Sequence, residues 1–60
     1  MIVKNDGQEL AKVLELDAGT LRHCGNFVFK AEKDGQPVTI YTQPVDEEFE
    51  RIQITGVLAV

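Results

Sequence analysis

The sequence predicts a small α+β fold in which a mainly antiparallel sheet packs against one N-terminal helix. Three observations lead to this expectation: a hairpin pattern over residues 26–43, an alternating apolar C-terminal strand, and a run of helix-forming residues over 8–17. The connections between the last strands are too short for parallel crossovers. An all-β small barrel or meander is the alternative. The length of 60 residues fits a single domain, residues 1–60.

The segment 8–17 decides between these two folds. As a helix it starts with Asp6 and Glu9 at capping-box spacing, although Leu16 falls outside the apolar side. Good helix formers dominate the segment, which favours this interpretation. If the helix continued through Leu21, Gly25 would be its C-cap glycine. The residues on its apolar side would be Leu10, Ala11, Val13, Leu14, Ala18 and Leu21.

The same segment can also be written as a strand. Leu10, Leu14 and Leu16 would then share one face, but Lys12 would lie among them. In that arrangement residues 1–4 would pair with the segment as a hairpin across the turn-forming residues 5–7.

Residues 26–43 have the alternation of a β-hairpin. Phe27, Phe29 and Ala31 would face one side, and Asp34 and Gly35 would form the centre of the turn. The return strand places a second apolar set on one face. Two prolines bracket this strand, which suits a short or edge strand. The apolar set is Val38, Ile40 and Thr42, and the prolines are Pro37 and Pro44.

The C-terminal third joins an acidic segment to an apolar strand. Asp46 could cap a short helical turn, with Glu47 and Arg51 at the spacing of an ion pair. The strand from Arg51 is apolar enough to be central or to lie in a subunit interface, and Gly56 suggests a bulge in it. The residues expected on one face are Ile52, Ile54, Leu58 and Val60.

Composition argues against several classes of protein. The net charge of −4, with 43% hydrophobic and 27% charged residues, is typical of a globular domain and unlike a basic nucleic-acid-binding protein. No apolar run could span a membrane, and we expect no signal peptide because the first residues lack its charged-then-apolar pattern. The single cysteine fits a reducing cytoplasm, of a cell or of a cell infected by a phage or mobile element. A chain this small buries little surface and cannot form an internal disulfide, so we expect a homo-oligomer.

The adjacent His23 and Cys24 are the only histidine and the only cysteine in the chain. Neighbouring side chains point in different directions, so His23 is badly placed to activate the thiol, and two ligands are too few for zinc. We therefore expect Cys24 near the core and His23 at the end of an element. With no serine and no phosphate-binding glycine motif, we expect no catalytic residues, no metal, no cofactor and no enzyme activity.

The function expected first is a small acidic protein-binding regulator or inhibitor that works as a homo-oligomer. An exposed sheet edge and an acidic segment would bind a protein partner with a basic surface. No membrane partner is expected. The expected partner-binding residues are Asp46, Glu47, Glu48 and Glu50.

Two other functions remain open. A nucleic-acid-binding regulator is less favoured because six basic residues face ten acidic ones, and because only Tyr41 is expected to be an exposed aromatic residue. Its candidate contacts are Lys30, Lys33, Tyr41 and Arg51. The other is a structural assembly protein, in which the apolar C-terminal strand would be buried between subunits.

Overall fold

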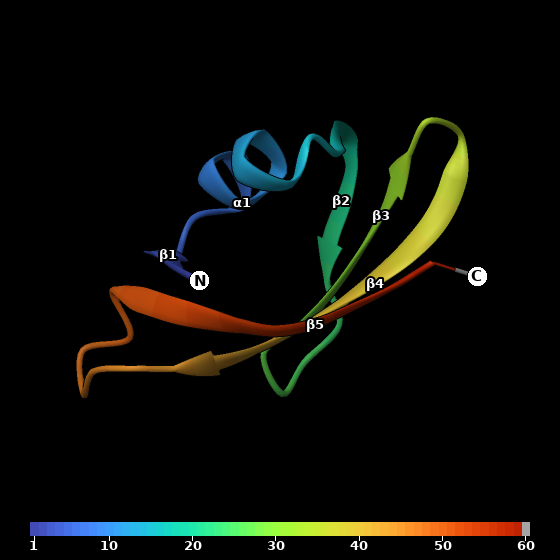
Figure 1. The fold of residues 1–60 in the computed structure, drawn as a ribbon. Helices are drawn as coiled ribbons and strands as arrows, with labels where there is room; N and C mark the ends of the chain where they lie inside the picture. Colours follow the sequence, from blue (N-terminus) through green and yellow to red (C-terminus); the bar gives the residue numbers. More distant parts are fainter. Residues whose placement is uncertain (60) are drawn as a thin grey trace.

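The computed structural model describes residues 1–59 and confirms the α+β class (Figure 1). All five strands form one antiparallel sheet in the order β1-β5-β4-β3-β2. The sheet curls into a half-barrel, and the helix packs between its two edge strands, β1 and β2. The elements are β1 (Ile2–Lys4), α1 (Gly7–Leu14), β2 (Asp17–His23), β3 (Val28–Lys33), β4 (Gln36–Pro44) and β5 (Arg51–Ala59).

Helix α1 begins as predicted and ends earlier. The Asp6 side chain caps it by accepting a hydrogen bond from the Gln8 amide at 3.0 Å. Glu15 then takes a positive φ of 57°, and the Leu16 amide donates to the Ala11 carbonyl at 2.8 Å. This is a Schellman termination, so the prediction of a helix through Leu21 is wrong. Leu16 did not fit the helical pattern because it packs against the core from beyond the helix.

The segment after the helix forms strand β2, where the sequence predicted a helix end followed by a loop. Its pairing with β3 is interrupted, because Asp17 lies opposite Glu32 whereas Arg22 lies opposite Lys30. The Thr20 hydroxyl fills this gap. It accepts a hydrogen bond from the Glu32 amide at 2.8 Å and donates one to the Asp17 carbonyl at 2.7 Å. A side chain thus replaces one rung of the backbone ladder.

Strand β1 pairs with β5, with Val3 opposite Ile52, and does not form a hairpin with the segment that follows it. The predicted β3–β4 hairpin is confirmed: Asp34 and Gly35 have φ values of 53° and 78°. Positive φ at both central positions is what a type I′ turn requires.

Strand β4 is central, so the prediction of an edge strand from its prolines is wrong. Pro37 is the second residue of the strand and Pro44 is the last. Because both prolines lie near its ends, the middle of the ladder keeps its amide donors.

The predicted bulge in β5 is present and changes which residues face the core. Tyr41 lies opposite Gly56 but Thr42 lies opposite Ile54, so Thr55 is an extra residue. Beyond it, Val57 lies opposite the buried Ile40 and joins the inner face. The prediction that Leu58 shares the face of Ile52 and Ile54 is therefore wrong, and Val60 lies outside the described residues.

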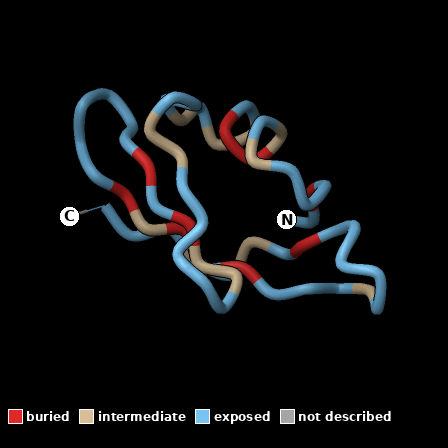
Figure 2. The backbone as a smooth tube through the Cα atoms, turned by 180° about the vertical axis from the view of Figure 1, so that it is seen from behind, coloured by how far each residue is buried: buried red, intermediate tan, exposed pale blue. Residues whose placement is uncertain are grey.

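The core is small and lies between α1 and the inner face of the sheet. Leu10, Ile40 and Ile52 are fully buried, and the buried positions form short, scattered segments of the chain (Figure 2). Several large apolar side chains stay at the surface: Met1, Ile2, Tyr41, Val45, Phe49, Val57 and Leu58. Helix α1 has eight residues. No helix within residues 1–59 is long and apolar enough to cross a membrane.

Candidate functional site

The loop between β4 and β5, residues 45–50, is the acidic loop. It is held in one conformation by its own hydrogen bonds. The Asp46 carboxylate accepts from the Glu50 amide at 2.9 Å, and its backbone carbonyl accepts from the Phe49 amide at 3.3 Å. At the base of the loop, the Val45 amide donates to the Arg51 carbonyl at 3.2 Å. Asp46 thus caps a single turn, with no helix beyond it.

Asn5 fixes the acidic loop from outside. Its side-chain amide donates to the Phe49 carbonyl at 2.8 Å, and its backbone amide donates to the Glu50 carbonyl at 2.8 Å. The sequence suggested only a turn at Asn5. Its contact spans 44 positions of the chain, and no local pattern encodes such a contact.

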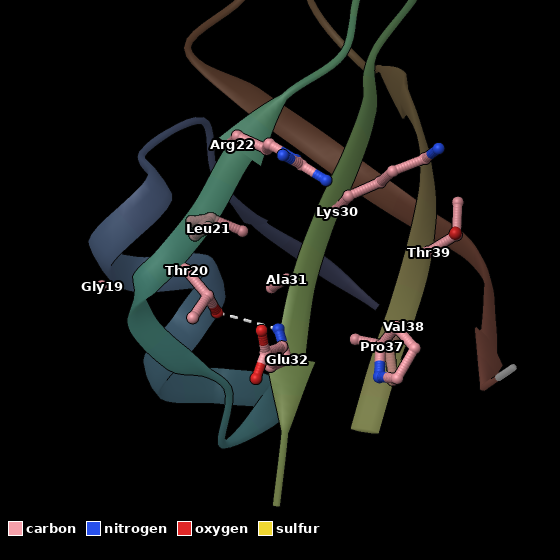
Figure 3. A pocket seen from close by; sticks show the side chains of 10 residues that line it. All are labelled: Gly19, Thr20, Leu21, Arg22, Lys30, Ala31, Glu32, Pro37, Val38 and Thr39. Atoms are coloured by element: carbon pink, nitrogen blue, oxygen red, sulfur yellow. Dashed lines mark hydrogen bonds between the residues drawn. The ribbon is translucent and has the colours of Figure 1, made fainter. Parts of the chain in front are cut away.

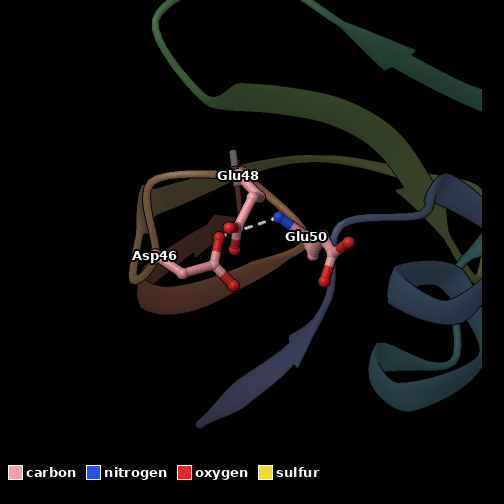
Figure 4. A group of neighbouring side chains, drawn as sticks. All are labelled: Asp46, Glu48 and Glu50. Carbon is pink, nitrogen blue, oxygen red and sulfur yellow. Dashed lines mark hydrogen bonds between the residues drawn. The ribbon is translucent and has the colours of Figure 1, made fainter.

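The predicted partner-binding carboxylates divide into two groups. Asp46 is half-buried and serves the loop itself, with one oxygen 3.9 Å from the Arg51 guanidinium. Glu47, Glu48 and Glu50 are exposed. Oxygens of Asp46, Glu48 and Glu50 lie within 4.8 Å of one another (Figure 4). The expected pair of Glu47 with Arg51 is not formed; within residues 1–59 the only ion pair is that of Asp46.

Two apolar side chains stand among these carboxylates. Phe49 is 51% exposed and Val45 is 41% exposed. The Phe49 ring packs at 5.6 Å from that of Phe27, which itself lies 6.5 Å from the His23 ring. The phenylalanines were expected in the core, so the exposure of Phe49 was missed. A lone phenylalanine within four acidic residues was the available signal.

The His23 and Cys24 pair lies where β2 ends. His23 is exposed there, as expected of an element end, and its ring packs 5.0 Å from that of Phe29. Cys24 is exposed, so the expectation of a core position is wrong. The reason is a tight turn: Gly25, Asn26 and Phe27 all have positive φ, and the Cys24 amide donates to the Val28 carbonyl. This turn leaves Cys24 outside the half-barrel.

The nucleic-acid candidates do not all lie together. Residues directly opposite in an antiparallel pair share a face, so Lys30, Tyr41 and Arg51 lie on the side of the sheet turned away from α1. We call this side the outer face. Lys33 is the last residue of β3 at the hairpin turn, and strand alternation places it on the other side.

An unpaired stretch of β5 forms the exposed sheet edge. Strand β1 covers β5 only through Gln53, and the Ile54 amide still donates to the Met1 carbonyl at 2.8 Å. On that side, residues 55–59 have no strand partner among residues 1–59. We call this stretch the open edge. It lies at the opposite end of β5 from the acidic loop, so the two parts of the predicted binding surface are not brought together.

Comparison of the chain with protein-family models, with curated protein sequences and with solved structures finds no match. The functional argument therefore rests on the surfaces described above.

Proposed function

We propose that this chain is a non-enzymatic protein-binding module that regulates or inhibits a larger partner through the acidic loop. The observation that carries the proposal is an ordered loop with a half-exposed Phe49 among three exposed carboxylates. Aromatic residues are typical anchors of interfaces, and carboxylates steer association toward basic surfaces. The partner would be a basic protein surface with an apolar pocket for Phe49. We place this encounter in the cytoplasm.

The geometry of the loop favours binding in two ways. Asn5 and Asp46 already fix its backbone, so docking costs little conformational entropy. The close carboxylates repel one another in the free protein, and a cationic partner would relieve that repulsion.

Cross-linking and mass spectrometry on tagged protein would identify the partner, and titration of the purified pair would test the loop. We expect Phe49→Ala to weaken binding by about 30-fold, the cost of losing a hot-spot residue. Glu47→Gln/Glu48→Gln should slow association at low salt. Glu15→Gln/Glu32→Gln is the matched control, because it removes the same charge from exposed positions outside the loop. Equal binding by wild type and Phe49→Ala would refute the docking role.

We propose further that a second copy of the chain pairs with the open edge. Residues 55–59 offer unpaired amides and carbonyls, and they carry no charged side chain that would oppose self-pairing. Val57 and Leu58 are 45% and 56% exposed there. Antiparallel pairing of two such edges is two-fold symmetric and would close at a dimer.

The native mass by light scattering tests this arrangement. We expect a dimer that Leu58→Lys converts to monomer, whereas Val45→Lys at the other end of β5 keeps the dimer. A monomeric wild type would remove the self-association. A large closed particle would favour the alternative of a structural assembly protein.

A further inference from the structure

The outer face of the sheet has a charge opposite to that of the whole chain. Four of the six cationic side chains lie on it, with two of the ten carboxylates. This gives the strands of the face a net charge of +2 on a protein whose net charge is −4, although the Asp46 carboxylate of the acidic loop lies 3.9 Å from Arg51. The cations are Lys4, Arg22, Lys30 and Arg51, and the carboxylates are Asp17 and Glu32, together at one end.

The four cations form two pairs of like charge. Arg22 lies directly opposite Lys30, and Lys4 directly opposite Arg51. Like charges at directly opposed positions destabilise a sheet. Among residues 1–59 no carboxylate forms an ion pair with Lys4, Arg22 or Lys30. Arg51 already has the Asp46 carboxylate at 3.9 Å, so the repulsion that the free protein retains is strongest between Arg22 and Lys30. An anionic ligand on this face would relieve it.

An exposed aromatic ring lies between the two cation pairs. Along the outer side of β4, Thr39 is opposite Lys30, Tyr41 comes next, and Val45 pairs with Arg51 beyond it. Tyr41 is 40% exposed. The residue opposite it on β3 is Val28, and the one on β5 is Gly56, which has no side chain to cover the ring. Exposed aromatic rings on sheets stack on nucleobases.

A shallow hollow adjoins the first cation pair. It runs over β2, β3 and β4 with a volume of about 640 Å³. Arg22 and Lys30 line it at one end, and Glu32 and Pro37 line it at the other (Figure 3). The Arg22 guanidinium extends toward β3 and the Lys30 amine toward β4 (Figure 3). These groups can donate hydrogen bonds to phosphate oxygens.

We infer that the outer face binds a single-stranded nucleic acid, whose phosphates contact the two cation pairs and one of whose bases stacks on Tyr41. The pairs are separated by up to about 20 Å along β4, so a single phosphate group cannot reach both. A strand with repeated phosphates and bases can. This inference goes beyond the acidic-loop proposal and does not depend on it.

Fluorescence anisotropy with a labelled oligo-dT of about 12 nucleotides tests the inference. Arg22→Gln/Lys30→Gln should weaken binding about tenfold or more. It should also lower the slope of log K against log salt by about 1.4, the effect of losing two contacts to a single strand. Lys12→Gln/Lys33→Gln removes the same charge from outside the outer face. We expect this control to bind within about twofold of wild type.

Tyrosine variants test the stacking contact separately from charge. Tyr41→Leu should weaken binding roughly tenfold without changing the salt slope, and Tyr41→Phe should retain wild-type affinity. Circular dichroism checks that each variant is folded.

Four results would overturn the inference. One is no binding at about 50 mM salt. Another is an equal loss of affinity in Arg22→Gln/Lys30→Gln and in Lys12→Gln/Lys33→Gln, which would mean that only the overall charge matters. The third is competition by polyglutamate as strong as by oligonucleotide, with Tyr41→Leu unchanged, which would assign the face to an acidic protein. Salt-sensitive self-association that Arg22→Gln/Lys30→Gln abolishes without oligonucleotide would instead assign it to a second copy of this chain.

Discussion

At the scale of single residues, short polar side chains hold the fold where strand pairing fails. The Thr20 hydroxyl bridges the gap between β2 and β3, and Asn5 ties the acidic loop to the N-terminal segment. The buried Thr42 hydroxyl donates to the Phe27 carbonyl, which also accepts the Thr42 amide. Each of these side chains forms a hydrogen bond with a backbone amide or carbonyl that, in a regular strand pair, would bond to another backbone group.

Thr20→Val should lower the free energy of unfolding by about 1–2 kcal/mol, because it keeps the shape of the side chain and removes two hydrogen bonds. Urea unfolding followed by circular dichroism measures the change. Thr20→Ser keeps the hydroxyl and should lose much less. If Thr20→Val and wild type unfold at the same urea concentration, the hydroxyl does not hold the two strands together.

At the scale of elements, the sequence could predict those that depend on local signals. The Asp34 and Gly35 turn and the Asp6 helix cap were expected from residue type and were found. Strand β2 was missed because its regular alternation is broken at Thr20. A hydrogen bond between the Thr20 side chain and β3 takes the place of regular pairing there. The candidate site likewise combines a feature that local sequence predicts with one that depends on a distant contact. The acidic run is visible in the sequence, but the hydrogen bond from Asn5 that holds the backbone at Phe49 spans 44 positions.

The like-charged pair of β2 and β3 makes a prediction at this scale. Arg22→Gln/Lys30→Gln should raise the free energy of unfolding by about 0.2–1 kcal/mol, because it removes a repulsion between opposed side chains. Thermal unfolding at low salt measures the difference, which should shrink as salt is added. Lys12→Gln/Lys33→Gln should give no such gain, since Lys33 lies opposite Gln36. A loss of stability in the first variant would contradict the repulsion.

At the scale of the whole molecule, the chain is elongated, with extents of 34 × 18 × 18 Å. The acidic loop and the open edge lie at opposite ends of β5, and each borders the outer face, the loop through Val45 and the open edge through Leu58. Among residues 1–59, the core that supports them contains eight buried apolar residues. A domain with so small a core gains much from association.

The melting temperature should therefore rise with protein concentration. If unfolding is coupled to dissociation of a dimer, each tenfold increase should raise it by about 3–6 °C. Differential scanning fluorimetry over a dilution series measures this. The melting temperature of Leu58→Lys should not change with protein concentration. A wild-type melting temperature that is also independent of concentration would contradict the dimer.

The extra residue at Thr55 makes β5 tolerant of a change of length at this point. Deletion of Thr55 would restore unbroken alternation in β5, and Gly56, Val57 and Leu58 would keep their partners on β4 and their faces of the sheet. Val57 would still point inward and Leu58 outward. Related chains that have lost this residue should therefore keep an apolar side chain at the position of Val57. Insertions within the acidic loop would also leave the orientation of β5 unchanged, so related chains should vary in length there too.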